Sequence, residues 1–403
     1  MWRFVAENRR WLGAGVLLTF AASFGQTWHI SLYAGQIRAE YGLSDGAWGS
    51  IYTAATLASA VLLMGRGGLA DTMPLGRLAP IIAAFYALAA LLMALGQTVA
   101  LLVLAVFALR FCGQGMFWHI SMTAMGRWFV ATRGRAVSIA GLGVSLGEVL
   151  LPLPMLGLAA WLGWRGAWGV AAVSIAVIVL PVLAYLLAQD RDPSGTDTTD
   201  RTAGLDGRHW TRTDALRHWL FWALLPLMMT PGFIGTVFFF HQAHVAEVKG
   251  WTLAAMAPAY PVFAGASVAM MLTAGRIADA VGPERMLPVT LLAMGAGCAL
   301  IGPSTAILGW VVALGCLGAS NGMFSALIGT LLPQVYGTQH LGSIRALAAA
   351  IMVFATAIGP GLTGWLIDLG IDFPDQGLGL ALWCAAISLA MLAVLVRLNR
   401  ATA

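Results

Sequence analysis

Long apolar runs alternate with short polar segments along the whole chain. The runs are about 20 residues long, which is the length at which an α-helix crosses the hydrocarbon core of a bilayer, whereas barrel strands alternate in polarity over about 10 residues. The pattern therefore predicts membrane-spanning helices rather than a barrel. The twelve predicted spans are 11–33, 47–65, 79–97, 99–126, 136–158, 166–188, 218–242, 252–275, 286–302, 306–332, 346–366 and 378–396.

The composition agrees with this pattern. Hydrophobic residues make up 60% of the chain, charged residues make up 10%, and the mean hydropathy is +0.83. A soluble domain carries roughly 25% charged residues, so this chain cannot cover a water-facing surface, and we expect an all-α integral membrane protein. The first run is too long for the core of a signal peptide and is interpreted as a retained helix. The four cysteines lie within apolar runs without paired spacing, which predicts free thiols.

Basic residues indicate the orientation of the spans. With twelve spans, both termini lie on the same side of the membrane. If that side is the cytoplasm, 18 of the 22 Lys and Arg residues fall in cytoplasmic segments, against Arg38, Arg165 and Lys249 outside and Arg110 within a span. Cytoplasmic segments carry an excess of basic residues in membrane proteins. The distribution therefore predicts that both termini are cytoplasmic.

The longest polar segment divides the chain into halves. Segment 189–217 is rich in Asp, Thr, Gly and Arg and lacks helical periodicity, which is typical of a linker. We therefore predict one six-helix bundle over 1–188, a cytoplasmic linker over 189–217 and a second six-helix bundle over 218–403.

A loop motif recurs half a chain apart and supports an internal duplication. The segment from Gly67 to Asp71 matches the segment from Gly275 to Asp279 at an offset of 208 residues, and each closes a hydrophobic span. Gly-Arg follows the first copy and ends at Arg77, and Gly-Pro-Glu-Arg follows the second copy and ends at Arg285.

This repeated motif resembles the loop signature of the major facilitator superfamily, whose members have twelve transmembrane helices in two pseudo-symmetric six-helix halves. The segment from Gly337 to Asp368 is similar to that of bacterial monocarboxylate-porter-like members. The resemblance implies alternating access around a central site and a place in the bacterial inner membrane. It also implies a gating role for the loop residues, for which the alternative is a purely topological role. The predicted gating residues are Asp71, Arg77, Asp279, Arg285, Arg135 and Arg345.

Two charged residues lie near the middle of predicted spans, namely Arg110 in span four and Glu148 in span five. A charge at the bilayer centre costs at least about 2.5–3.5 kcal/mol and indicates a functional site. The run from Arg110 to Gly115 also resembles a fourth-helix motif that is associated with proton transfer in proton-coupled members of the superfamily. In the functional interpretation, Glu148 titrates, and Arg110 is its partner or the anchor of a substrate carboxylate. In the alternative, the two form a permanent pair that holds two helices in register.

Uncharged polar residues and histidines on the cavity-type spans are further candidates for substrate contact. Two of the histidines, in spans one and seven, are expected near the outer ends of their helices, and the histidine in span four near the inner end. The histidines of spans one and four are thus about 20 Å apart in depth, too far to share a metal ion. The alternative for all these residues is a hydrogen bond that links helices. The candidates are Gln26, His29, Gln114, His119, His241 and Asn321.

The sequence contains neither a P-loop pattern nor the spacing of a nucleophile–base pair or a metal site, so we expect neither an enzyme nor a cofactor. We predict a secondary transporter, monomeric and proton-coupled, that moves a small organic anion through the lipid bilayer and binds no nucleic acid. One alternative is a proton-driven exporter of drugs or amphiphilic metabolites. The other is a non-transporting receptor on the same scaffold.

Overall fold

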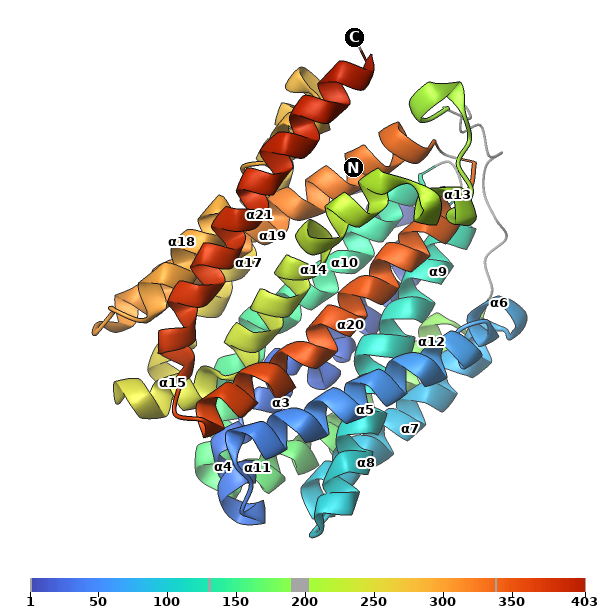
Figure 1. The fold of residues 1–403 in the computed structure, drawn as a ribbon. Helices are drawn as coiled ribbons and strands as arrows, with labels where there is room; N and C mark the ends of the chain where they lie inside the picture. Colours follow the sequence, from blue (N-terminus) through green and yellow to red (C-terminus); the bar gives the residue numbers. More distant parts are fainter. Residues whose placement is uncertain (1, 130–131, 190–202, 338, 403) are drawn as a thin grey trace. The chain divides into compact units, whose positions relative to one another are not determined.

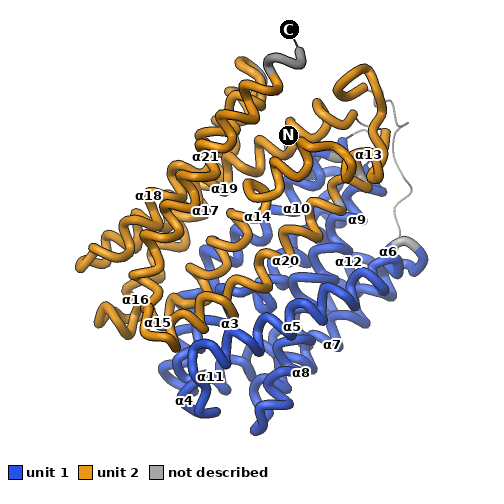
Figure 2. The backbone as a smooth tube through the Cα atoms, in the orientation of Figure 1, with its two compact units in different colours: residues 1–198 blue, residues 199–403 orange. Residues whose placement is uncertain are grey.

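The computed structural model describes residues 2–129, 132–189, 203–337 and 339–402, and helices make up nearly all of this part of the chain (Figure 1). The chain divides into two compact units, residues 1–198 and residues 199–403 (Figure 2). A helix satisfies its own backbone hydrogen bonds, which is why apolar runs of this length fold as helices in a membrane.

Six spans make up the first unit, and several of them are interrupted. Span one is broken into three short helices, span four contains the π-helical segment η2, and spans five and six meet at Gly163, whose positive φ of 72° turns the chain. The elements are α1 (Trp2–Glu7), α2 (Arg9–Ala21), η1 (Ala22–Gly25), α3 (Thr27–Ser31), α4 (Ala34–Tyr41), α5 (Asp45–Arg66), α6 (Leu69–Thr72), α7 (Leu75–Leu95), α8 (Val99–Leu109), η2 (Arg110–Phe117), α9 (Trp118–Trp128), α10 (Arg133–Leu150), α11 (Pro152–Ser174), η3 (Ile175–Val179) and α12 (Leu180–Leu186).

The second unit contains the remaining six spans after a short lead-in segment. Of the predicted linker 189–217, residues 190–202 lie outside the described part of the chain, and residues 203–217 hold η4 and α13. The elements are η4 (Leu205–Gly207), α13 (Arg212–Arg217), α14 (Trp219–Phe240), α15 (Gln242–Lys249), α16 (Leu253–Met256), α17 (Ala259–Val281), η5 (Pro283–Met286), α18 (Leu292–Ile301), α19 (Ile307–Tyr336), α20 (Leu341–Asp368) and α21 (Phe373–Thr402).

The predicted number of spans agrees with these helices. Nine helices within the described residues are long and apolar enough to cross a membrane. The other three predicted spans are span one, which is broken; span five, which is α10 with the start of α11; and span nine, which holds the short apolar helix α18. The fold is therefore the predicted all-α architecture with twelve spans.

The two units pair their helices in the same way. Spans one and five pack together in the first unit as α2 and α10, and spans seven and eleven do so in the second as α14 and α20. The pairs formed by spans two and four and by spans three and six likewise recur as spans eight and ten and spans nine and twelve. The fold thus contains the internal repeat that the loop motif indicated.

Single residues repeat as well, 208 positions apart. Gly42 and Gly250 end α4 and α15, the helices that follow spans one and seven, in the left-handed conformation, with φ of 63° and 67°. Ser44 and Thr252 then cap the helix that follows, each accepting a backbone N–H three residues later. A side-chain oxygen at this position satisfies one of the free N–H groups of a helix start, so both halves use the same turn.

Small residues bring spans one and five together. A Cβ atom added to Gly143 would lie 2.1 Å from Thr19 Oγ1, and one added to Gly147 would lie 2.0 Å from Ser23 Oγ. Glycines four residues apart allow close helix contact in membranes, where packing rather than hydrophobicity drives association. This contact fixes α10, and with it Glu148, against α2.

Candidate functional site

The π-helical segment η2 begins at Arg110, in the middle of span four. Gly113 in this segment packs against Gly25 in span one, and a Cβ atom on Gly113 would lie 2.3 Å from the Tyr86 hydroxyl. A Cβ atom on Gly25 would lie 2.3 Å from the carbonyl oxygen of Leu109. Two glycines are therefore required for spans one and four to approach so closely. Single π-turns within helices are frequent at functional sites, and here the π-turn carries the predicted site arginine.

Arg110 is only 2% exposed, and the described groups around it are neutral. Its Nη1 donates to the Gly25 carbonyl oxygen at 3.1 Å and to Thr27 Oγ1 at 3.4 Å. The guanidinium carbon lies 5.1 Å from the centroid of the Tyr52 ring, in cation–π contact. The Tyr52 hydroxyl and Thr27 Oγ1 are 2.5 Å apart, so Thr27 joins the other two side chains. Arg110 Nε has no hydrogen-bond partner among the described residues.

Glu148 does not pair with Arg110 in this structure. The glutamate is half-buried on α10 and forms no hydrogen bond or ion pair with any described residue. Within the described residues, no carboxylate oxygen lies within 4.0 Å of the Arg110 guanidinium. A buried charge normally requires a partner of opposite sign, so the direct environment of Arg110 leaves its positive charge uncompensated.

His29 lies in an aromatic cage and is 0% exposed. Its ring centroid lies 5.2 Å from Phe24, 5.3 Å from Trp28, 5.8 Å from Tyr33 and 5.1 Å from Trp168, and every contact is edge-to-face. Neither ring nitrogen has a hydrogen-bond partner among the described residues. The surrounding rings separate His29 from any open surface of its unit.

The other two candidate histidines link helices. The His119 Nε2 lies 3.1 Å from the Gly67 carbonyl oxygen and joins span four to the end of span two. The buried His241 Nε2 lies 2.7 Å from Thr363 Oγ1, and the Thr363 hydroxyl donates to the Gly359 carbonyl oxygen. Since the threonine hydroxyl has one hydrogen, it accepts from His241, whose Nε2 is then the protonated nitrogen.

The uncharged candidates differ in their surroundings. Gln26 is half-buried at the break before α3, one residue from the Thr27 that contacts Arg110. Gln114 lies in η2 with Oε1 buried and without a partner among the described residues. Asn321 donates to Ser267 Oγ at 3.3 Å and thereby links α19 to α17. Of the predicted polar residues, Gln26 and Gln114 therefore belong to the elements that hold Arg110.

The structure describes the side chains of four of the six predicted gating residues, all of them arginines. The side chains of Asp71 and Asp279 lie outside the described residues. Arg77, Arg135 and Arg285 are exposed at helix ends, and Arg345 is an exposed residue that donates from Nη2 to the Gly329 carbonyl oxygen at 3.2 Å. Arg127 was not among the predicted gating residues, yet its Nη1 donates to the carbonyl oxygen of Ala70 in the first gate loop at 3.4 Å.

One buried tyrosine in each unit was also not predicted, although the sequence carried a signal for the pair. Tyr52 in span two and Tyr260 in span eight are 208 residues apart, and both are buried. Tyr52 contacts Thr27 in span one, and the Tyr260 hydroxyl donates to Gln242 Oε1 in span seven at 2.7 Å. Each unit thus has a buried tyrosine at the equivalent position, in contact with a polar side chain of the unit's first span.

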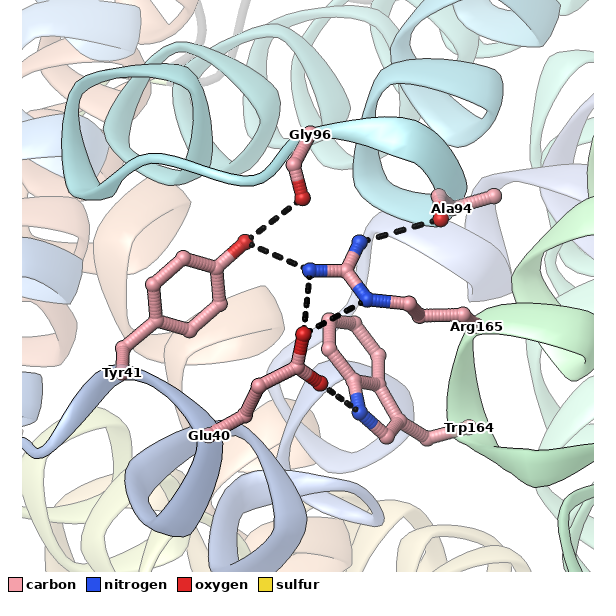
Figure 3. Close-up of polar contacts among 6 residues, drawn as sticks. All are labelled: Glu40, Tyr41, Ala94, Gly96, Trp164 and Arg165. Atoms are coloured by element: carbon pink, nitrogen blue, oxygen red, sulfur yellow. Dashed lines mark hydrogen bonds and ion pairs between the residues drawn. The ribbon is translucent and has the colours of Figure 1, made fainter.

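A polar cluster at the other end of the first unit was not predicted either (Figure 3). We call it the Glu40–Arg165 cluster; it consists of Glu40, Tyr41, Trp164 and Arg165. Arg165 donates to Glu40 Oε1 from Nε at 2.9 Å and from Nη2 at 2.7 Å, and Trp164 Nε1 donates to Glu40 Oε2 at 2.8 Å. Hydrogen bonds from Arg165 are the main cause that lowers the pKa of the Glu40 carboxyl.

The cluster ties three spans of the first unit together. Arg165 Nη1 donates to the Ala94 carbonyl oxygen at 3.0 Å, and the Tyr41 hydroxyl donates to the Gly96 carbonyl oxygen at 2.8 Å. Lys249, which is 208 residues after Tyr41, donates to the Gly302 carbonyl oxygen at 2.5 Å in the second unit. Both units therefore anchor the helix that follows their first span, α4 or α15, on a glycine at the end of their third span.

The sequence and fold both match known proteins. The sequence profile described as Major Facilitator Superfamily matches residues 15–360. No curated protein sequence matches the chain. The crystal structure of a bacterial homologue of the human lysosomal transporter Spinster, inward-facing and unoccupied, is similar with a TM-score of 0.68 at 17% identity, over 97% of this chain and 94% of that one.

The nucleoside transporter NupG is similar with a TM-score of 0.73 at 13% identity, over 95% of this chain and 98% of that one. At these identities the two structures are evidence for the fold alone. The profile, in contrast, covers most of the chain and includes the loop motif near Gly275. The chain therefore belongs to the major facilitator superfamily.

Proposed function

We propose that this protein is a secondary transporter that carries a small organic anion across the membrane by alternating access, coupled to protons. The observation that carries the proposal is the buried Arg110, whose described neighbours are a carbonyl, a hydroxyl and an aromatic ring rather than a carboxylate. An intramembrane charge of this kind is expensive and marks a functional site. The missing negative charge is supplied by the cargo.

The hydrogen bonds of Arg110 favour a carboxylate. Nη1 is occupied by Gly25 and Thr27, whereas Nε has no partner, and no hydrogen bond to a described residue involves Nη2. These two nitrogens form one edge of the guanidinium, which matches the two oxygens of a carboxylate. Because Arg110 is almost fully buried, cargo reaches this edge only when the helices around it move, as alternating access requires.

Glu148 is the proposed proton carrier. It is half-buried, has no hydrogen-bond or ion-pair partner among the described residues, and lies on the helix that packs against span one. Binding an anion at Arg110 together with a proton at Glu148 would make the loaded site neutral, which lowers the cost of moving it through the membrane. Gln26 and Gln114 would orient the cargo from the two elements that hold Arg110.

The remaining parts of the proposal rest on the sequence. The loop residues Asp71 and Asp279 would gate the cytoplasmic side with their basic neighbours, and both termini would lie in the cytoplasm by the distribution of basic residues. The functional division would be two bundles, 1–188 and 218–403, joined by the linker 189–217. We place the protein in the bacterial inner membrane as a monomer that uses no cofactor.

Uptake into proteoliposomes tests the proposal. A panel of labelled monocarboxylates, dicarboxylates and amphiphilic cations is presented with and without an inward proton gradient. We expect gradient-driven uptake of at least one monocarboxylate, its loss in Arg110→Gln, and uptake that no longer responds to pH in Glu148→Gln. Arg3→Gln is the matched control, since Arg3 is exposed and paired only with Glu7. Uptake of cations alone, or full monocarboxylate uptake by Arg110→Gln, would overturn the assignment.

A further inference from the structure

An apolar groove of about 350 Å³ runs along the surface of the first unit. Its walls are formed mainly by α2 and α10, and one charged residue, Arg9, lines it. Gly13, Val16 and Phe20 of α2 and Ile139 and Leu146 of α10 form much of the rest of its lining. Gly13 borders the open part of the groove, since a Cβ atom added there would meet nothing within 4 Å.

The stretch of α2 that lines the groove is about as long as one bilayer leaflet is thick. From Arg9 to Phe20, the axis of α2 rises about 16 Å at about 1.5 Å per residue. Half of the hydrocarbon core of a bilayer is about 15 Å thick. Because the apolar run of span one begins at residue 11, Arg9 lies at the level of the lipid headgroups, and the groove points from there toward the middle of the membrane.

Arg9 is free to bind a ligand, whereas its neighbour Arg10 is not. Arg10 donates to the Leu186 and Tyr185 carbonyl oxygens at 2.8 and 2.7 Å and to Gln189 Oε1 at 2.7 Å, which ties span one to the end of span six. Arg9 is exposed and makes no hydrogen bond or ion pair with a described residue. A free guanidinium at headgroup level attracts anionic lipids and binds phosphate oxygens in pairs.

We propose that this groove binds one acyl chain of an anionic phospholipid from the leaflet in which Arg9 lies, with the lipid phosphate at Arg9. The apolar walls take the chain, and Arg9, the charged residue of the groove lining, selects the charge of the headgroup. One basic residue near the membrane surface corresponds to about a fivefold preference for an anionic over a zwitterionic headgroup. This inference does not depend on the cargo of the transporter.

Native mass spectrometry of the full chain tests the proposal. Phosphatidylglycerol and phosphatidylcholine with identical chains are titrated into the detergent-solubilised protein. The dissociation constants of the two lipids at the tightest-binding site are then compared. We expect phosphatidylglycerol to bind about fivefold more tightly. Arg9→Gln should abolish this preference while phosphatidylcholine still binds, and Gly13→Phe, which fills the groove, should remove the site for both lipids.

Matched controls separate the groove from general effects. Arg3→Gln removes an exposed arginine that is paired with Glu7, and Gly65→Phe adds the same ring at a glycine of span two where a Cβ atom also meets nothing within 4 Å. Both should leave lipid binding unchanged. A photoactivatable phosphatidylglycerol should label α2 or α10. An unchanged lipid preference in Arg9→Gln, equal binding in the two phenylalanine variants, or labelling confined to other helices would overturn the proposal.

Discussion

Replacing Tyr52 by phenylalanine or leucine separates its hydroxyl contact with Thr27 from its ring contact with Arg110. Phenylalanine removes the hydroxyl that lies 2.5 Å from Thr27 Oγ1 but keeps the ring at 5.1 Å from the guanidinium. A typical hydrogen bond between neutral groups contributes about 0.5–1.5 kcal/mol net. Leucine also removes the cation–π contact, which is worth about 2 kcal/mol when desolvated. We therefore expect local destabilisation of about 1 kcal/mol for Tyr52→Phe and about 3 kcal/mol for Tyr52→Leu.

Cys112 provides a local readout, because it is 2% exposed and lies in η2 two residues after Arg110. In a variant that retains only this cysteine, a thiol reagent labels the protein when η2 opens, so the labelling rate follows the opening equilibrium. Since 1.4 kcal/mol corresponds to a factor of 10, labelling should accelerate about fivefold in Tyr52→Phe and more than 100-fold in Tyr52→Leu.

Tyr260→Phe is the matched control, since Tyr260 makes the equivalent contact with Gln242 in the second unit. It should leave the labelling rate of Cys112 unchanged. Equal rates in Tyr52→Phe and Tyr52→Leu, or an equal effect of Tyr260→Phe, would refute the assignment of Tyr52 to the Arg110 environment.

Three further substitutions test other parts of the structure. His29→Phe should keep or raise the midpoint of thermal unfolding in detergent, because it removes two buried ring nitrogens without described partners, each costing about 1–3 kcal/mol; a lower midpoint would contradict this. Hydrogen bonds from Arg165 lower the pKa of the Glu40 carboxyl. The contribution of ionised Glu40 to protein stability is therefore complete above the unfolded pKa of about 4.3, and it is lost as the pH falls through the lower folded pKa. Glu40→Gln should therefore lower the stability of the protein near neutral pH but not in acid. The loss should be small, because the Glu40–Arg165 pair is partly exposed. A loss of stability that does not depend on pH would disprove the cluster's role. Gly147→Ala places a Cβ atom about 2.0 Å from a neighbouring oxygen and should destabilise the unit by about 1–3 kcal/mol, whereas Gly141→Ala, which meets nothing within 4 Å, should be neutral; equal effects would contradict the helix contact.

The spans and the internal repeat could be predicted because the length of the apolar runs and the 208-residue offset can be read directly from the sequence. The breaks in span one could not be predicted, since Gln26 and Tyr33 leave the helical conformation although no proline interrupts the run. The unit's contact between spans one and four explains the break: Gly25 lies against the carbonyl oxygen of Leu109. Tertiary packing therefore overrides the local preference there.

Arg110 was identifiable because a charge stands out within an apolar run, but its partners were not. Thr27 and Tyr52 do not stand out in the sequence, and only folding brings them to Arg110. Thr27, for example, is 83 positions away from Arg110 in the sequence. Glu148 stood out for the same reason as Arg110, yet the direct pair is not formed in this structure. Equal depth in neighbouring helices allows a contact but does not specify how each helix is rotated. The bond between Glu40 and Arg165 spans 125 positions and left no sequence signal.

Equilibrium binding of a monocarboxylate to the purified protein measures the central claim most directly. The transported acid is titrated into wild type, Arg110→Lys and Arg110→Gln. If the Arg110 guanidinium binds the cargo through two nitrogens, Arg110→Lys should bind the acid at least tenfold more weakly, because lysine keeps the charge but cannot form two parallel hydrogen bonds. Arg110→Gln should show no measurable binding. Binding of wild-type strength in Arg110→Gln would contradict the account.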